Sequence, residues 1–221
     1  MAEAMTVETV VEAEWHLQGY WTKLRFPFKV KRGWSDIDIL AYHPEKHHLV
    51  IAESKVRGSK KVVFAYTDYS RKKEGSILDY DDKGIYFSFL KNIRLLCLDG
   101  VIFADFKKMV KTLTIQLVSN YYIDEKNKNN AQKTVDDYIE KCIPLGIKRD
   151  VKLDSTLDVI LRIMHEEDRN PQERRYGHPI IDLARELNRY MHPEIHYAGR
   201  GSEVGDEIKR KIQQAFSCER E

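Results

Sequence analysis

Residues 35–56 restrict the fold of this chain more than any other part of its sequence. The segments 35–42 (SDIDILAY) and 49–56 (LVIAESKV) are short and mainly apolar, and the polar segment 43–48 joins them. Such segments are typical of neighbouring strands in a sheet that is covered on both faces. Each segment carries charged residues at alternate positions near one end. We therefore expect two paired strands that gather acidic side chains at one end of a sheet.

The charged residues of these strands form a candidate site. Because side chains alternate between the faces of a strand, Glu53 and Lys55 point one way and Ser54 the other. Asp36 and Asp38 likewise share a face. Neighbouring carboxylates repel unless a cation holds them, and Mg²⁺ prefers such oxygen ligands. A lysine beside them suits activation of a water or stabilisation of a phosphate, so the pattern favours phosphodiester hydrolysis.

The flanking segments predict the rest of an α/β domain. A helix over 6–18, N-capped by Thr6, precedes a strand over 20–30 in which Pro27 indicates an edge position or a bend. Residues 112–123 alternate like a further strand. The other expected elements are helices over 60–69, 85–95 and 131–142, a charged connection over 70–84 and a polar loop over 124–130.

Pro144 and Gly146 mark an expected boundary between two regions. The first region, residues 1–145, contains the candidate site. The second, residues 146–221, is expected to be helical, because helical patterns run over 155–165, 180–191 and 204–216.

The order of elements and the residues DILA at 38–41 and IAESK at 51–55 resemble the PD-(D/E)xK nuclease superfamily. Residues 6–70 are also similar to archaeal Holliday-junction resolvases and Mrr-like enzymes, with LQGY at 17–20 at the join of helix and strand. Ser35 or Ile37 stands where the family's proline precedes the aspartate. The resemblance implies a restriction-endonuclease-like αβββαβ core, with a mixed central sheet flanked by helices and a helical C-terminal appendage.

The same resemblance implies a Mg²⁺-dependent endonuclease, in which Mn²⁺ can substitute. Asp38 and Glu53 would bind the metal, and Lys55 would activate or orient the attacking water. Asp36 is an additional ligand or the alternative to Asp38, and the Ser54 carbonyl completes the set. Members of the family commonly place a further glutamate on the first helix. Glu8 is the expected residue, with Glu12 one turn later as the alternative.

The partner implied is nucleic acid, DNA rather than RNA, and cutting of two strands would favour a homodimer. Phosphate contacts are expected from Lys31, Arg32, Arg57, Lys60 and Lys61, and Trp21 and Trp34 are candidates for stacking on bases. The net charge of +2 argues against a generally basic surface. A non-catalytic binding or assembly module that keeps the nuclease fold remains the alternative.

The three cysteines are far apart and fit free thiols of a reducing cytosol. The acidic start of the chain is unlike a signal peptide, and no apolar run is long enough to span a membrane. We therefore expect a cytoplasmic location.

Overall fold

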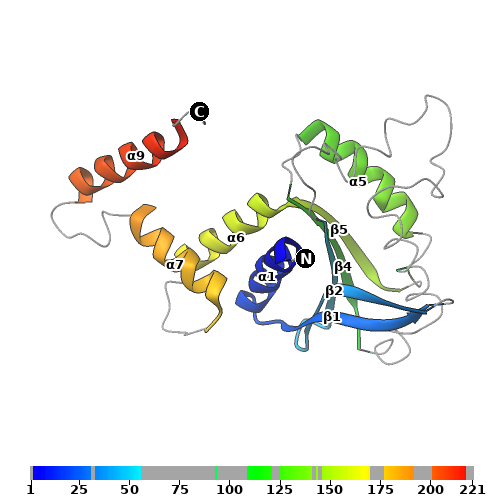
Figure 1. Ribbon diagram of the computed structural model, residues 1–221. Helices are drawn as coiled ribbons and strands as arrows, with labels where there is room; N and C mark the ends of the chain where they lie inside the picture. The colour runs from blue at the N-terminus through cyan, green and yellow to red at the C-terminus, as the bar shows by residue number, and fades with distance from the viewer. Residues whose placement is uncertain are drawn as a thin grey trace. The chain divides into compact units, whose positions relative to one another are not determined.

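The computed structural model describes residues 2–30, 33–55, 93, 109–120, 125–140, 143, 146–169, 177–191 and 201–217. The chain forms two compact units, Met1–Val159 and Ile160–Glu221. The described part of the first unit contains a five-stranded mixed sheet in the order β1-β2-β3-β4-β5 (Figure 1). The α/β class expected from the sequence is therefore confirmed.

The first three strands form an antiparallel meander. They are β1 (Trp21–Val30), β2 (Gly33–His43) and β3 (His48–Lys55), close to the expected bounds. β1 is at the edge of the sheet, as Pro27 predicted, since proline has no N–H to donate to a neighbouring strand. The meander places the start of β2 beside the end of β3, where the acidic residues lie.

The remaining two strands are parallel to β3. β4 (Thr112–Ser119) pairs with β3, and β5 (Lys148–Ser155) pairs with β4. β4 was expected, whereas β5 lies within residues 146–221, where only helices were expected. Val151 and Leu153 of β5 are buried, so this strand extends the core of the first unit to Val159 and not to residue 145.

Two helices cover opposite faces of this sheet (Figure 1). α5 (Glu125–Glu140) packs Val135 and Ile139 against the apolar core of the sheet. The polar loop expected over 124–130 is wrong, since α5 includes residues 125–130; their polar composition fits a helix with only a narrow apolar stripe. α1 (Ala2–Leu17) covers the other face and begins before Thr6, so the expected N-cap at Thr6 is wrong.

Three further helices follow β5 and agree with the helical patterns of the sequence. They are α6 (Thr156–Arg169), which begins in the first unit, α7 (Pro179–Met191) and α9 (Gly201–Ser217). Within the second unit, Asn188 Nδ2 donates to the carbonyl of Met164 and joins α7 to α6. The helices expected over 60–69 and 85–95 and the connection over 70–84 lie outside the described residues, apart from Ile93.

Candidate functional site

The pairing of β2 with both neighbouring strands is interrupted at Asp38. Arg25 would lie opposite Asp38 in β1, but this pair is missing from an otherwise continuous ladder. The ladder with β3 ends at Ile39 and Ala52, so Asp38 and Glu53 are the next positions of the two strands. Arg25 has a φ of 50°, in the left-handed region that residues other than glycine rarely adopt. A local distortion of the sheet therefore surrounds Asp38.

The distortion reverses the faces of β1. Before it, Thr22 Oγ1 donates a hydrogen bond of 3.0 Å to Glu12 of α1, so even-numbered residues face that helix. After it, Phe26 and Phe28 pack with the core on the α5 side of the sheet. The reversal at Arg25 directs this side chain toward α1, whereas ordinary alternation would direct it to the opposite face.

Asp38 is held by the residue between Glu53 and Lys55. Its Oδ2 accepts hydrogen bonds from the backbone N–H of Ser54, at 2.7 Å, and from Ser54 Oγ, at 3.0 Å. Glu53 is 7% exposed, and strand alternation puts it on the opposite side of β3 from Ser54. Lys55 ends β3, and its side chain lies outside the described residues. Asp36 is exposed, two residues before Asp38 on β2. The convergence of Asp38, Glu53 and Lys55 stays a prediction.

Glu8 reaches the same region from α1. This residue is 5% exposed, and its carboxylate accepts two hydrogen bonds from Arg25, at 3.1 Å from Nε and 3.3 Å from Nη2. The pKa of Arg25 is raised, first by the hydrogen bond to Glu8 and then by the charge of Glu8, with smaller contributions from Asp36 and Asp38. Arg25 therefore connects the buried acid of α1 with the acids of β2.

Arg25 was not singled out from the sequence, where it was one of many basic residues near the site. Its contact with Glu8 depends on its positive φ. The presence of one arginine in a strand rich in aromatic residues does not predict that backbone conformation. The five residues predicted to contact nucleic acid lie outside the described part of the chain: Lys31, Arg32, Arg57, Lys60 and Lys61.

The donor set of the site suits a hard cation. Asp38 and Glu53 occupy the next positions of β2 and β3 and would offer carboxylate oxygens, and Mg²⁺ is commonly bound by one or two carboxylates with water and substrate phosphates. In the part of the chain that the structure describes, no group of three or more His, Cys, Asp or Glu residues is close enough to hold a metal ion. Glu8 is instead engaged by Arg25.

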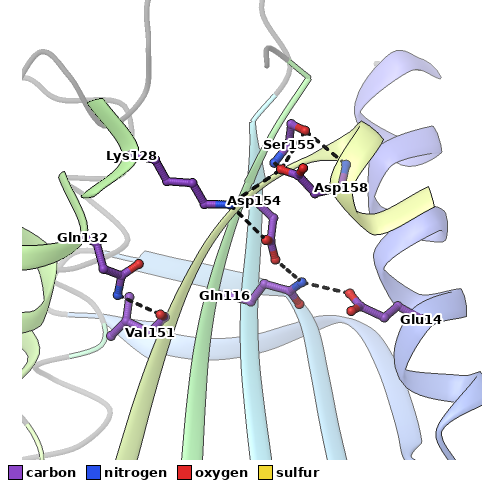
Figure 2. A network of polar contacts seen from close by, with 8 residues as sticks. All are labelled: Glu14, Gln116, Lys128, Gln132, Val151, Asp154, Ser155 and Asp158. Carbon is purple, nitrogen blue, oxygen red and sulfur yellow. Dashed lines mark hydrogen bonds and ion pairs between the residues drawn. The ribbon is translucent and has the colours of Figure 1, made fainter. Parts of the chain in front are cut away.

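A buried polar network lies between α1 and the sheet, on β4 and β5 (Figure 2). Gln116 of β4 is fully buried, and its Nε2 donates to Glu14 at 2.9 Å and to Asp154 at 3.0 Å. Its Oε1 accepts a 2.7 Å hydrogen bond from Trp15 Nε1. Glu14 and Asp154 are themselves 2% and 5% exposed. One amide therefore joins α1 to both parallel strands.

The network continues toward α5 and α6. Lys128 Nζ lies 3.7 Å from carboxylate oxygens of both Asp154 and Asp158. Asp158 also accepts hydrogen bonds from the backbone and hydroxyl of Ser155, which hold the first turn of α6 (Figure 2). The sequence signal for this network was the alternation of Val151 and Leu153 in 148–155, which indicates a strand. The network fixes α1, and with it Glu8, against the sheet.

His43 and His48 pack edge-to-face against the ring of Tyr20. His48 is hydrogen-bonded through Nδ1 to the hydroxyl of Tyr20 and through Nε2 to Thr114 Oγ1. Burial lowers the pKa of His48, and the charges of Lys152 and Lys46 lower it further. His48, the first residue of β3, is therefore a half-buried link between β3 and β4.

Comparisons with known proteins give no family for this chain. No family model matches it, and no curated protein matches it. A solved structure described as a protein of unknown function, AF1548, shares 13% identity over 94% of this chain and 97% of its own, with a TM-score of 0.36. A likeness this low carries no argument about fold or function. Among the described residues, no helix is long and apolar enough to cross a membrane.

Proposed function

We propose that this protein is a metal-dependent endonuclease with a PD-(D/E)xK-like site, and that it acts on DNA. The observation that carries the proposal is the interruption of both β2 ladders at Asp38, next to Glu53 and across from Arg25. Strand pairing normally uses the backbone groups at such positions, whereas here the backbone N–H of Ser54 is bonded to the carboxylate of Asp38. The buried Glu8 is bonded to Arg25 at this distortion of β1.

The chemistry follows from the residue types. A bound Mg²⁺ would neutralise charge on a phosphate and make a coordinated water more acidic. Asp38 and Glu53 would hold the cation, with the Ser54 carbonyl as a further oxygen ligand. The hydrogen bonds from Ser54 orient Asp38. Mn²⁺ offers similar coordination and is expected to substitute for Mg²⁺.

Lys55 of β3 and Arg25 of β1 would supply positive charge from the two strands that flank β2. Lys55 would orient the attacking water or stabilise the phosphate as negative charge develops. Arg25, half exposed and bonded to Glu8, keeps this acid in a fixed orientation near Asp38. Asp36 is exposed on β2, two residues before Asp38, and remains the alternative to Asp38 as a metal ligand.

The test is cleavage of supercoiled, branched and single-stranded DNA and of RNA, with Mg²⁺ or Mn²⁺. Wild-type protein is expected to cut DNA, whereas Glu53→Gln and Lys55→Met are expected to lose about 100-fold or more of the rate, as removal of one charge-stabilising group commonly does. Lys46→Met, which alters a cation of the turn between β2 and β3, is the matched control. Equal cutting by all variants would place the activity elsewhere.

The alternative function is a nucleic-acid-binding module without catalysis. It would be favoured if the wild-type protein binds DNA and cuts none of these substrates with either metal. A mass measurement of the DNA-bound protein in solution would test whether cutting of two strands involves a homodimer.

A further inference from the structure

Trp34 and Lys29 form an exposed pair on the β1–β2 hairpin. The two residues are directly opposite each other in the ladder, so their side chains leave the same face. Trp34 is 74% exposed, and Lys29 is also exposed. An indole with most of its surface in water, beside an ammonium group, is a suitable platform for a planar group that carries a negative charge.

The pair lies on the same side of the sheet as α1 and the side chain of Arg25. Because Phe28 and Val30 pack with the core on the α5 side, Lys29 between them points to the other side. Arg25 bonds α1 on that same side. Trp34 is four residues before Asp38 on β2, about 13 Å at ~3.3 Å per residue.

The charge of β1 favours an anionic partner. After the reversal at Arg25, the exposed side chains of β1 on this side of the sheet include two cations and no carboxylate: Arg25, Pro27 and Lys29. Asp36, opposite Pro27, contributes the nearby exposed negative charge on β2. The hairpin therefore presents cations along its edge and an aromatic face near its end.

We propose that Trp34 stacks on an unpaired base of a nucleic acid and that Lys29 contacts the adjoining phosphate. A base within a continuous duplex is covered on both faces by its neighbours, whereas an unpaired or terminal base has a face free to stack on an indole. This inference rests on the proposed function for its class of partner and adds the preferred substrate, a single strand or a junction with one. At ~3.4 Å per nucleotide of a stacked strand, the scissile bond would lie within roughly four nucleotides of that base.

The experiment measures the affinity of the full chain for labelled single-stranded DNA, for a duplex with a single-stranded overhang, and for a blunt duplex, without added metal. Trp34→Ala is expected to weaken binding of the first two about 5- to 150-fold, the range that corresponds to one stacked base, and to leave the blunt duplex nearly unchanged. Trp34→Phe is expected to retain most of the affinity. Trp21→Ala is the matched control, because Trp21 is 72% exposed on the same hairpin.

Trp21 precedes Thr22, which faces α1, so Trp21 points to the opposite side of the sheet from Trp34. Equal losses in Trp21→Ala and Trp34→Ala, or an equal loss on the blunt duplex, would overturn the inference. The inference would also be overturned if Trp34→Ala changed the oligomeric mass of the free protein while its binding to DNA stayed the same. That result would identify a second copy of the chain as the partner of Trp34. Trp34-dependent binding without cleavage would retain this inference and reject the nuclease proposal; cleavage with unchanged binding in Trp34→Ala would do the reverse.

Discussion

Replacing Gln116 with leucine should destabilise the fold strongly, because one buried amide satisfies three partners. Its Nε2 donates to the carboxylates of Glu14 and Asp154, and its Oε1 accepts from Trp15. Leucine keeps much of the volume and removes all three hydrogen bonds. Two buried carboxylates and an indole N–H would then each lose a partner between α1 and the sheet.

The expected loss follows from the types of bond. Hydrogen bonds to charged groups contribute about 1.5–3 kcal/mol each, and a neutral one about 0.5–1.5 kcal/mol. Their sum is about 3.5–7.5 kcal/mol, and we expect the lower end, about 3–4 kcal/mol, because Glu14 and Asp154 keep further interactions and leucine adds apolar contact. This is a large part of the stability of a typical domain, about 5–15 kcal/mol.

Urea unfolding followed by far-UV circular dichroism measures the effect. With a slope of about 2–3 kcal/mol per molar urea, the midpoint should fall by about 1–2 M. The matched control is Gln132→Leu on α5, where the amide donates to the Val151 carbonyl and to Asp136 while partly exposed. This change should cost about 1 kcal/mol. Similar losses in the two variants would refute the idea that Gln116 holds the buried acids.

A related substitution separates charge from hydrogen bonding. Gln116→Glu places a third carboxylate beside Glu14 and Asp154, and their charges should raise its pKa in the folded protein. A raised folded-state pKa favours folding below the ordinary pKa of glutamate, and this contribution is lost as the pH rises through the raised value. The variant should therefore lose less stability, relative to the wild type, at pH 5 than at pH 7. An equal loss at both values would contradict the proximity of the three acids.

Two further predictions concern local conformation and pH. At position 25, where φ is 50°, Arg25→Gly should melt at a higher temperature than Arg25→Ala. At Lys23, on the same strand, the alanine variant should melt at a higher temperature than the glycine variant. A higher melting temperature for alanine at both sites would mean that position 25 requires no left-handed conformation. His48, whose pKa is lowered by burial and by Lys152 and Lys46, contributes stability that is present above its unfolded pKa near 6.5 and is lost as the pH falls through the lower folded value. The melting temperature of His48→Gln should therefore fall less than that of the wild type between pH 7 and pH 5, and equal falls would exclude this histidine as the cause.

The meander could be predicted from sequence because its signals are local. Short, mainly apolar runs indicate β2 and β3, and aromatic and β-branched residues with Pro27 indicate β1; the expected bounds agree within about two residues with those observed. β5 was missed because five of its eight residues are charged and only Val151 and Leu153 are large and apolar. Its burial comes from pairing with β4, a contact between distant parts of the chain.

The site shows the same division. The positions of Asp38 and Glu53 on adjacent strands follow from alternation and a short turn. The hydrogen bonds of Asp38 to Ser54 and the pairing of Glu8 with Arg25 do not, because the first occur where the β2–β3 ladder ends and the second occurs where β1 is distorted at Arg25. The sequence of β1 contains no insertion or glycine that would indicate a reversal of its two faces at Arg25.

The central claim is that Asp38 and Glu53 hold a divalent cation used to cut DNA. The most direct measurement is calorimetric titration of Mn²⁺ into wild type, Asp38→Asn and Asp36→Asn, with the cleavage rate of each protein measured in parallel. We predict that Asp38→Asn loses both metal binding and cleavage, while Asp36→Asn, which changes an exposed acid of the same strand, keeps both. Wild-type protein that binds no Mn²⁺ with or without DNA, or unchanged binding and cleavage in Asp38→Asn, would contradict the account.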